Sequence, residues 1–153
     1  MRRSRFAILV LLVFAPASGY GGKFEVTENL TPAPVEMKQA IVQLHPSYSH
    51  CIFTGKPFDL DGDGESTDYI ATATGCGRSG NYPIFLFRLE NDSFVEVLQY
   101  SGYALATDNN TAGGLNNISV SADTGDGRTL ITLWVYNGKH YVKKRGRVLE
   151  IFR

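Results

Sequence analysis

The chain has 153 residues, with 15 basic and 15 acidic side chains, 43% hydrophobic residues, 16 glycines and two cysteines. This length favours a single domain, and the aromatic content of 12% and the moderate charge argue against intrinsic disorder. The formal charge of zero argues against nucleic-acid binding through bulk charge, and two cysteines are too few for a Cys₄ zinc site.

The first nineteen residues have the three-part pattern of a secretory signal peptide. Arg2, Arg3 and Arg5 precede the apolar run 6–14, and small residues then place the expected cleavage near Gly19. The run is too short for a transmembrane anchor, which needs about 20 apolar residues, and no later run could span a membrane. We therefore predict a periplasmic or secreted protein, whose remaining residues include 12 basic and 15 acidic side chains.

Residues 20–33 are rich in glycine and proline and are interpreted as an N-terminal arm in front of a single domain, residues 34–153. One helix is predicted at the start of that domain. Pro34 suits its first position, Thr31 is expected to help cap it, and Pro46 ends it. The apolar residues at helical spacing on its predicted buried face are Met37, Ala40, Ile41 and Leu44.

The apolar pattern then changes to a period of two, with turn residues between short runs. The predicted strands are 68–74, 83–90, 94–100, 115–122, 129–136 and 140–143, with a further one at 148–152. Residues 107–114 are expected to be irregular, and Asn137-Gly138 is a strong hairpin signal. The pattern predicts an α+β domain, an antiparallel meander of about five to seven strands with the helix packed on one face.

The two cysteines, Cys51 and Cys76, would meet an oxidising compartment after export, so a disulfide between them is predicted. It would close a loop of about 25 residues and stabilise the fold by roughly 3–4 kcal/mol. The alternative is a metal or nucleophile site formed by His50 and Cys51. No Ser-His-Asp pattern or G-x-S-x-G motif is present, so no catalytic residue is assigned.

The segment 59–70 reads DLDGDGESTDYI and predicts a calcium loop. Calcium takes six to eight oxygen ligands, and alternating carboxylates converge where glycines let the backbone curl. The candidate ligands are Asp59, Asp61, Asp63, the Glu65 carbonyl, Thr67 and Asp68. An EF-hand has a bidentate Glu at its twelfth position, where this loop has Ile70. The alternative is a solvated turn, although these acids would repel each other without a cation.

The loop resembles the Asp-rich loops of FG-GAP and VCBS-type β modules. Their last acid is usually at position nine, where this chain has Thr67, and Asp68 is tenth. The similarity extends over residues 51–142 to uncharacterised secreted bacterial proteins, through the segments YIATAT, GCGRSG, IFLFRL and YNGKHY. The resemblance implies a β-rich exported domain and no particular activity. From the loop chemistry, calcium would bind weakly, with a dissociation constant of about 10⁻⁴–10⁻³ M, and would have a structural role.

The C-terminal residues 139–153 carry six basic side chains and one acidic one, whereas residues 20–138 carry six basic and 14 acidic ones. A local basic surface of this kind could contact an anionic partner. The candidate contacts are Lys139, Lys143, Lys144, Arg145 and Arg147. The alternative is that these cations keep an exposed edge strand from pairing with other chains.

Three functions are compatible with these features. The prediction is an exported, non-catalytic binding module, stabilised by calcium and a disulfide, for an unknown protein or glycan of the cell envelope. The alternative is a periplasmic inhibitor or immunity-type protein of a cell-wall enzyme or toxin, which the size, the export pattern and the lack of a catalytic motif favour. A hydrolase with Asp and His residues gathered from separate strands is the third, and no motif supports it.

Overall fold

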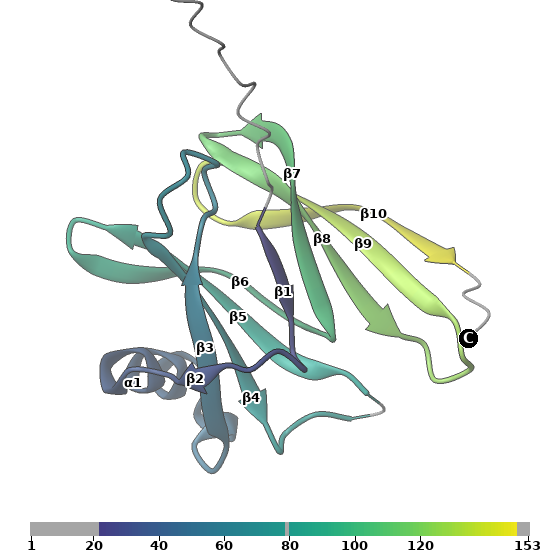
Figure 1. The fold of residues 1–153 in the computed structure, drawn as a ribbon, viewed down its shortest axis with the longest axis horizontal. Helices are drawn as coiled ribbons and strands as arrows, with labels where there is room; N and C mark the ends of the chain where they lie inside the picture. The colour runs from purple at the N-terminus through teal and green to yellow at the C-terminus, as the bar shows by residue number, and fades with distance from the viewer. Residues whose placement is uncertain (1–21, 79, 150–153) are drawn as a thin grey trace, which may run out of the picture.

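The computed structural model describes residues 22–78 and 80–149, so the predicted signal peptide, residues 1–19, lies outside it. Within these ranges the chain forms ten strands, one α-helix and one 3₁₀ turn. The helix α1 spans Val35–Leu44, and the turn η1 spans Pro46–Tyr48. The strands lie in two five-stranded sheets, and Figure 1 shows α1 beside only one of them.

The sheet beside α1, called sheet B, has the strand order β2-β3-β4-β5-β6. All its neighbours are antiparallel and consecutive in the chain, so it is a meander. Its strands are β2 (Thr31–Pro32), β3 (Ile52–Phe58), β4 (Asp68–Thr74), β5 (Tyr82–Glu90) and β6 (Ser93–Gly102).

The other sheet, called sheet A, has the order β1-β7-β8-β9-β10 and is also antiparallel throughout. The chain passes from sheet B into sheet A at Tyr103, between β6 and β7, and β1 pairs beside β7. The strands are β1 (Lys23–Glu25), β7 (Ala104–Ala112), β8 (Leu115–Asp123), β9 (Thr129–Tyr136) and β10 (Tyr141–Leu149).

Sheet B contributes side chains to two separate hydrophobic clusters. The cluster shared with sheet A includes Phe24, Phe58, Leu60, Ile70, Ile84, Leu86, Leu105, Ile118, Val120, Tyr136 and Tyr141. The other cluster contains Met37 and Ile41 of α1 with Cys51, Phe53, Tyr69, Ala71, Ala73, Phe85 and Phe87. Alternate side chains of a strand point to opposite faces, and each face of β4 is covered by one of these clusters. Six consecutive residues of β4 are therefore buried. The outer face of sheet A, turned away from sheet B, lies in neither cluster.

The α+β class with antiparallel strands and one helix is confirmed, but the strands form two sheets rather than a single meander. Residues 107–112, expected to be irregular, belong to β7, and β3 was not predicted. The two runs expected at 140–143 and 148–152 are joined in β10, whose described part ends at Leu149. The segment interpreted as an arm contributes β1 and β2, and its Phe24 is fully buried.

The start of α1 differs from the expectation. Pro34 is the N-cap residue, and no side chain caps the helix. Thr31 lies in β2 instead, where its hydroxyl donates a hydrogen bond to the Gly55 carbonyl at 3.3 Å. On the predicted buried face, Met37 and Ile41 are buried, whereas Leu44 is 56% exposed because the helix ends there.

Candidate functional site

The Asp-rich loop, residues 59–67, connects β3 to β4. Gly62 and Gly64 have φ values of 78° and 90°, which side-chain-bearing residues rarely adopt, so the tight curl depends on both glycines. The fully buried Leu60 anchors the loop in the core, and its carbonyl accepts a hydrogen bond from the Asn116 amide of β8 at 2.8 Å. The loop is therefore attached to both sheets.

Three carboxylates gather at the tip of this loop. Oxygens of Asp59, Asp61 and Asp63 lie within 4.8 Å of one another. The Asp59 carboxylate accepts hydrogen bonds from the Gly62 amide at 2.7 Å and the Gly64 amide at 3.0 Å, which orient it. Partial burial and the neighbouring carboxylates raise the pKa of Asp61. An oxygen-only, negatively charged and solvent-open set of this kind fits a hard cation that completes its shell with water.

Of the other three candidate ligands, Asp68 lies outside this carboxylate group. Glu65 and Thr67 are exposed, and the Glu65 carbonyl accepts a hydrogen bond from the Thr67 amide at 3.0 Å. Asp68 is 5% exposed, and its carboxylate accepts hydrogen bonds from the Leu89 amide at 2.9 Å and the Leu60 amide at 3.4 Å. Burial raises the pKa of Asp68. Its carboxylate thus connects the loop to β5, and the structure brings together the carboxylates of Asp59, Asp61 and Asp63 without that of Asp68.

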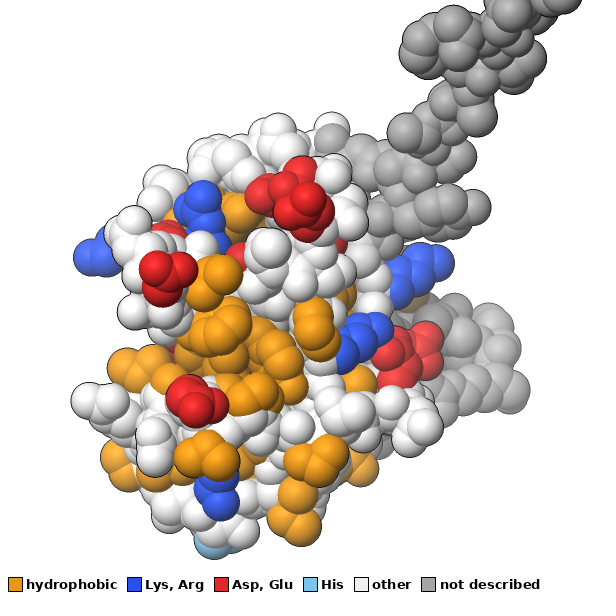
Figure 2. All heavy atoms as spheres, turned by 60° about the vertical axis from the view of Figure 1, so that its left-hand side comes forward, with side chains coloured by type: hydrophobic (Ala, Val, Ile, Leu, Met, Phe, Trp, Pro, Cys, Tyr) orange, Lys and Arg blue, Asp and Glu red, His pale blue; other side chains and the backbone are white. Residues whose placement is uncertain are grey.

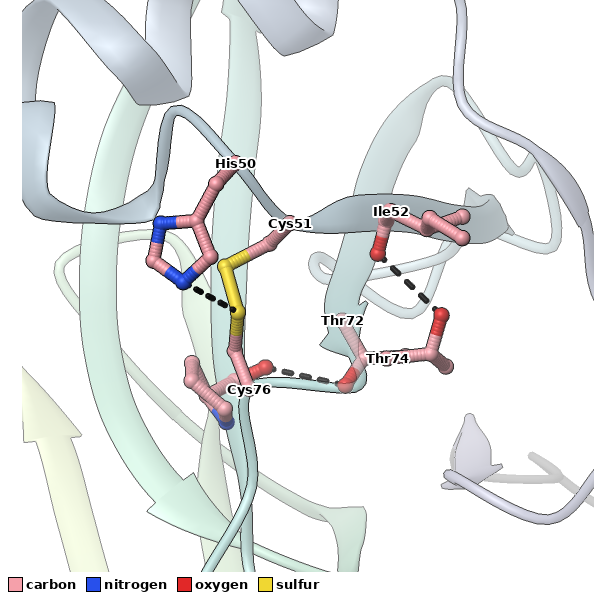
Figure 3. Close-up of a disulfide and its surroundings, with 7 residues drawn as sticks. His50, Cys51, Ile52, Thr72, Thr74 and Cys76 are labelled. Atoms are coloured by element: carbon pink, nitrogen blue, oxygen red, sulfur yellow. Dashed lines mark hydrogen bonds between the residues drawn. A yellow bond between two sulfur atoms is a disulfide. The ribbon is translucent and has the colours of Figure 1, made fainter.

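The predicted disulfide joins Cys51 and Cys76, at the ends of β3 and β4 (Figure 3). Figure 3 also shows the exposed His50 ring turned toward Cys76, with its Nε2 3.6 Å from the sulfur. These three residues are close enough to share a metal ion. Because the disulfide consumes both thiols, however, neither sulfur is free to act as a ligand or a nucleophile in this state.

The predicted basic residues are divided by a β-bulge. The β10–β9 register shifts between Lys143 and Arg145, so Lys144 is the extra residue. Lys143 lies on the same face of β10 as Gly146, because a Cβ added to Gly146 would come within 3.9 Å of the Lys143 side chain. Arg145 and Arg147 lie on the outer face of sheet A, and Lys139 is in the β9–β10 turn. The basic strip is therefore not one continuous surface.

A shallow hollow of about 410 Å³ lies on the outer face of sheet A. Register places Arg145 opposite Leu133 of β9, and Arg147 opposite Ile131. Asp108 of β7 lines the opposite side of this hollow. Among the described residues no carboxylate pairs with either guanidinium, whereas Arg88 pairs with Glu90 and Arg128 with Asp126. We call this region the Arg145–Arg147 face.

An apolar hollow between α1 and the β5–β6 hairpin was not predicted. Its volume is about 390 Å³, and its lining residues are Pro34, Glu36, Met37, Ala40, Asp92, Ser93 and Phe94. Leu89, which pairs with Phe94 across the hairpin, and Phe94 are each 39% exposed. Figure 2 shows hydrophobic side chains gathered in the middle of this side of the molecule, with acidic side chains around them. The sequence signal is two large apolar residues flanking the turn at Asn91-Asp92.

A histidine–carboxylate pair joins the end of α1 to β6, and it was also not predicted. The His45 Nε2 lies 2.9 Å from the nearer Glu96 oxygen, and the Tyr48 and Phe85 rings pack against the imidazole. Burial raises the pKa of Glu96. The pair connects two elements far apart in the sequence, and no described serine or cysteine thiol contacts it.

Comparison with protein-family models, curated proteins and solved structures finds no match to this chain. The FG-GAP/VCBS-like resemblance of the Asp-rich loop therefore stays a prediction. In the described residues no helix is long and apolar enough to cross a membrane. The fold and its surfaces define a disulfide-bonded, two-sheet α+β domain with an acidic loop and a separate arginine-bearing face.

Proposed function

We propose that the protein is an exported, non-catalytic binding module that holds an anionic protein or glycan of the cell envelope on the Arg145–Arg147 face. The observation that carries this proposal is the pair of exposed guanidiniums without a described carboxylate partner, beside the half-buried Ile131 and Leu133. Guanidinium groups bind carboxylate, sulfate or phosphate through two parallel hydrogen bonds. Apolar side chains next to them supply contact area that a purely charged surface lacks.

Binding of anionic polymers tests this proposal. Arg145→Gln/Arg147→Gln is expected to weaken binding of polyglutamate, or of an acidic polysaccharide, at least about tenfold, because two charge-assisted contacts are each worth about 1 kcal/mol or more. Lys23→Gln/Lys38→Gln removes the same charge from exposed positions elsewhere and is the matched control. Titration calorimetry at 50 and 200 mM salt measures both. An equal loss in the two variants would show only general attraction and would contradict the proposal.

We further propose that the Asp59–Asp61–Asp63 cluster holds calcium with a structural role. The three carboxylates come together without a described basic partner, and Leu60 links the loop to both sheets. A bound cation would offset the repulsion between the carboxylates and stiffen this connection. The donors are all oxygens, which suits calcium better than a softer metal.

Calcium titration gives a direct measurement. At about ten times the dissociation constant, calcium is expected to add about 1.4 kcal/mol to the free energy of unfolding. Asp61→Asn/Asp63→Asn should abolish this gain, and Asp92→Asn, in the β5–β6 turn, should keep it. Thermal melting in 10 mM calcium or in chelator reads the difference. Equal melting temperatures for the native chain in both solutions would rule out the calcium site.

The alternative function, an inhibitor or immunity-type protein of a cell-wall enzyme or toxin, is favoured by the apolar hollow and the projecting β5–β6 hairpin (Figures 1 and 2). A partly exposed aromatic side chain such as Phe94, beside an apolar hollow, is a typical anchor in protein–protein interfaces. Phe94→Ala should then abolish inhibition in assays with purified peptidoglycan hydrolases. Full activity of every hydrolase in the presence of the native protein would remove the support for this alternative.

A further inference from the structure

Strand β10 is a long, open edge of sheet A. Among the described residues it pairs on one side only, with β9, through eight of its nine residues. The opposite edge of the same sheet, β1, has three residues. In β10 the residues 143–148 are all exposed, so one row of backbone amides and carbonyls is available for pairing.

The two arginines of this edge have the spacing of alternate residues on one face of a strand. Arg145 and Arg147 both line the outer-face hollow, and their Cα atoms are separated by about 7 Å, two residues of an extended strand. An extended peptide with acidic residues at positions i and i+2 carries its carboxylates at the same separation. Such a peptide can therefore place one carboxylate opposite each guanidinium while its backbone pairs with β10.

We propose that β10 binds an extended acidic peptide segment of a partner protein as a sixth strand of sheet A, with alternate carboxylates opposite Arg145 and Arg147. This inference rests on the proposed function, in which the Arg145–Arg147 face binds an anionic partner, and it identifies the partner as a protein segment. Backbone hydrogen bonds to the open edge supply affinity, and the two arginines select for acidic residues in the correct register.

The charges of β10 select against other occupants of this edge. A second copy of the chain pairing through β10 would bring Lys143, Arg145 and Arg147 near the same residues of its partner, and like charges opposite each other destabilise a strand pair. An uncharged strand on this edge would shield the Arg145 and Arg147 guanidiniums from water and offer them no carboxylate partner, which costs free energy. The same cations that prevent self-association therefore favour an acidic strand.

Synthetic peptides test the inference with the intact protein. The first peptide alternates Glu and Val over nine residues with both ends blocked, and the second has the same composition with its Glu residues placed together. The alternating peptide is expected to bind at least about tenfold more tightly and to slow amide hydrogen exchange in β10 but not in β1. N-methylation of alternate amides along its pairing edge should abolish binding, because the hydrogen-bond donors are lost.

Charge reversal provides the matched variants. The Arg145→Glu/Arg147→Glu variant should no longer bind the Glu-Val peptide and should bind a Lys-Val peptide of the same pattern. The Lys23→Glu/Lys38→Glu variant, which has the same net charge, should keep the native preference for the Glu-Val peptide. If the native protein binds the alternating peptide and the peptide with clustered Glu residues with equal affinity, and β10 amides gain no protection, strand addition is overturned, while the anion-binding face stays in place. If polyglutamate also fails to bind, both the inference and the proposed function are wrong.

Discussion

Reduction of the Cys51–Cys76 disulfide is expected to lower the free energy of unfolding by about 3.5 kcal/mol. The bond closes a loop with a sequence separation of 25 residues, and its main effect is to restrict the unfolded chain. In the folded protein β3 and β4 pair at this end without help from the bond, because Ile52 lies opposite Thr74 and the Thr74 hydroxyl donates a hydrogen bond to the Ile52 carbonyl at 3.1 Å. Urea unfolding of the oxidised and the reduced protein measures the difference.

The double variant Cys51→Ala/Cys76→Ala separates cross-linking from packing. Cys51 is 5% exposed and belongs to the cluster that contains Met37 and Ile41, whereas Cys76 is only partly buried. The reduced protein keeps both sulfur atoms, so the double variant should be less stable than the reduced protein by about 1 kcal/mol. Identical urea midpoints for the oxidised and reduced protein would contradict the expected stabilisation.

Two strands, β4 and β9, were predicted with the boundaries that the structure has, because compact apolar runs with turns at both ends are local signals. Strand β3 was missed because its segment IFTGKPF contains a glycine and a proline, which lower strand propensity. The glycine is needed there, since a Cβ on Gly55 would come within 2.3 Å of the Ile70 carbonyl oxygen of β4. The reason for a glycine at position 55 is its contact with the neighbouring strand β4, which a local sequence pattern does not include.

Strand β7 was missed for a different reason. Its segment ALATDNNTA ends in polar residues that favour turns, so the pattern predicted an irregular segment. β8 pairs with both ends of β7, including Thr111 and Ala112, and this pairing supplies the order that the polar segment's own propensity does not. The second sheet was not separated from the first because the chain changes sheet at a single residue, Tyr103, directly between β6 and β7.

The candidate sites also differ in whether one segment or several distant segments form them. The clustering of Asp59, Asp61 and Asp63 follows from contacts within five residues, and the sequence pattern predicted it. The separation of Lys143 from Arg145 depends on a bulge in the β9–β10 pairing, and the apolar hollow combines α1 with a hairpin about fifty residues away. Features made by distant segments required the structure, whereas features made by one loop did not.

Asp68→Ala is expected to lower the free energy of unfolding by roughly 2–4 kcal/mol. The carboxylate is buried and accepts hydrogen bonds from two amides, those of Leu89 and Leu60, which would be left without a partner. Each buried donor that loses its partner costs about 1–3 kcal/mol, and the longer Leu60 contact contributes the smaller share. A role as an exposed calcium ligand would instead give a loss that disappears in chelator. Urea unfolding with and without calcium distinguishes the two roles.

Asp68→Asn keeps one acceptor oxygen and removes the charge, so its loss of stability should be smaller than that of Asp68→Ala. The pH dependence separates the charge from the hydrogen bonds. Because burial raises the pKa of Asp68 in the folded protein, the folded state holds more protons than the unfolded chain above about pH 4, and this carboxyl makes stability rise as the pH falls through that window. The Asn variant should therefore show a flatter stability curve there than the native chain. A parallel curve would mean that folding does not raise the pKa of Asp68, and would contradict the expected effect of burial.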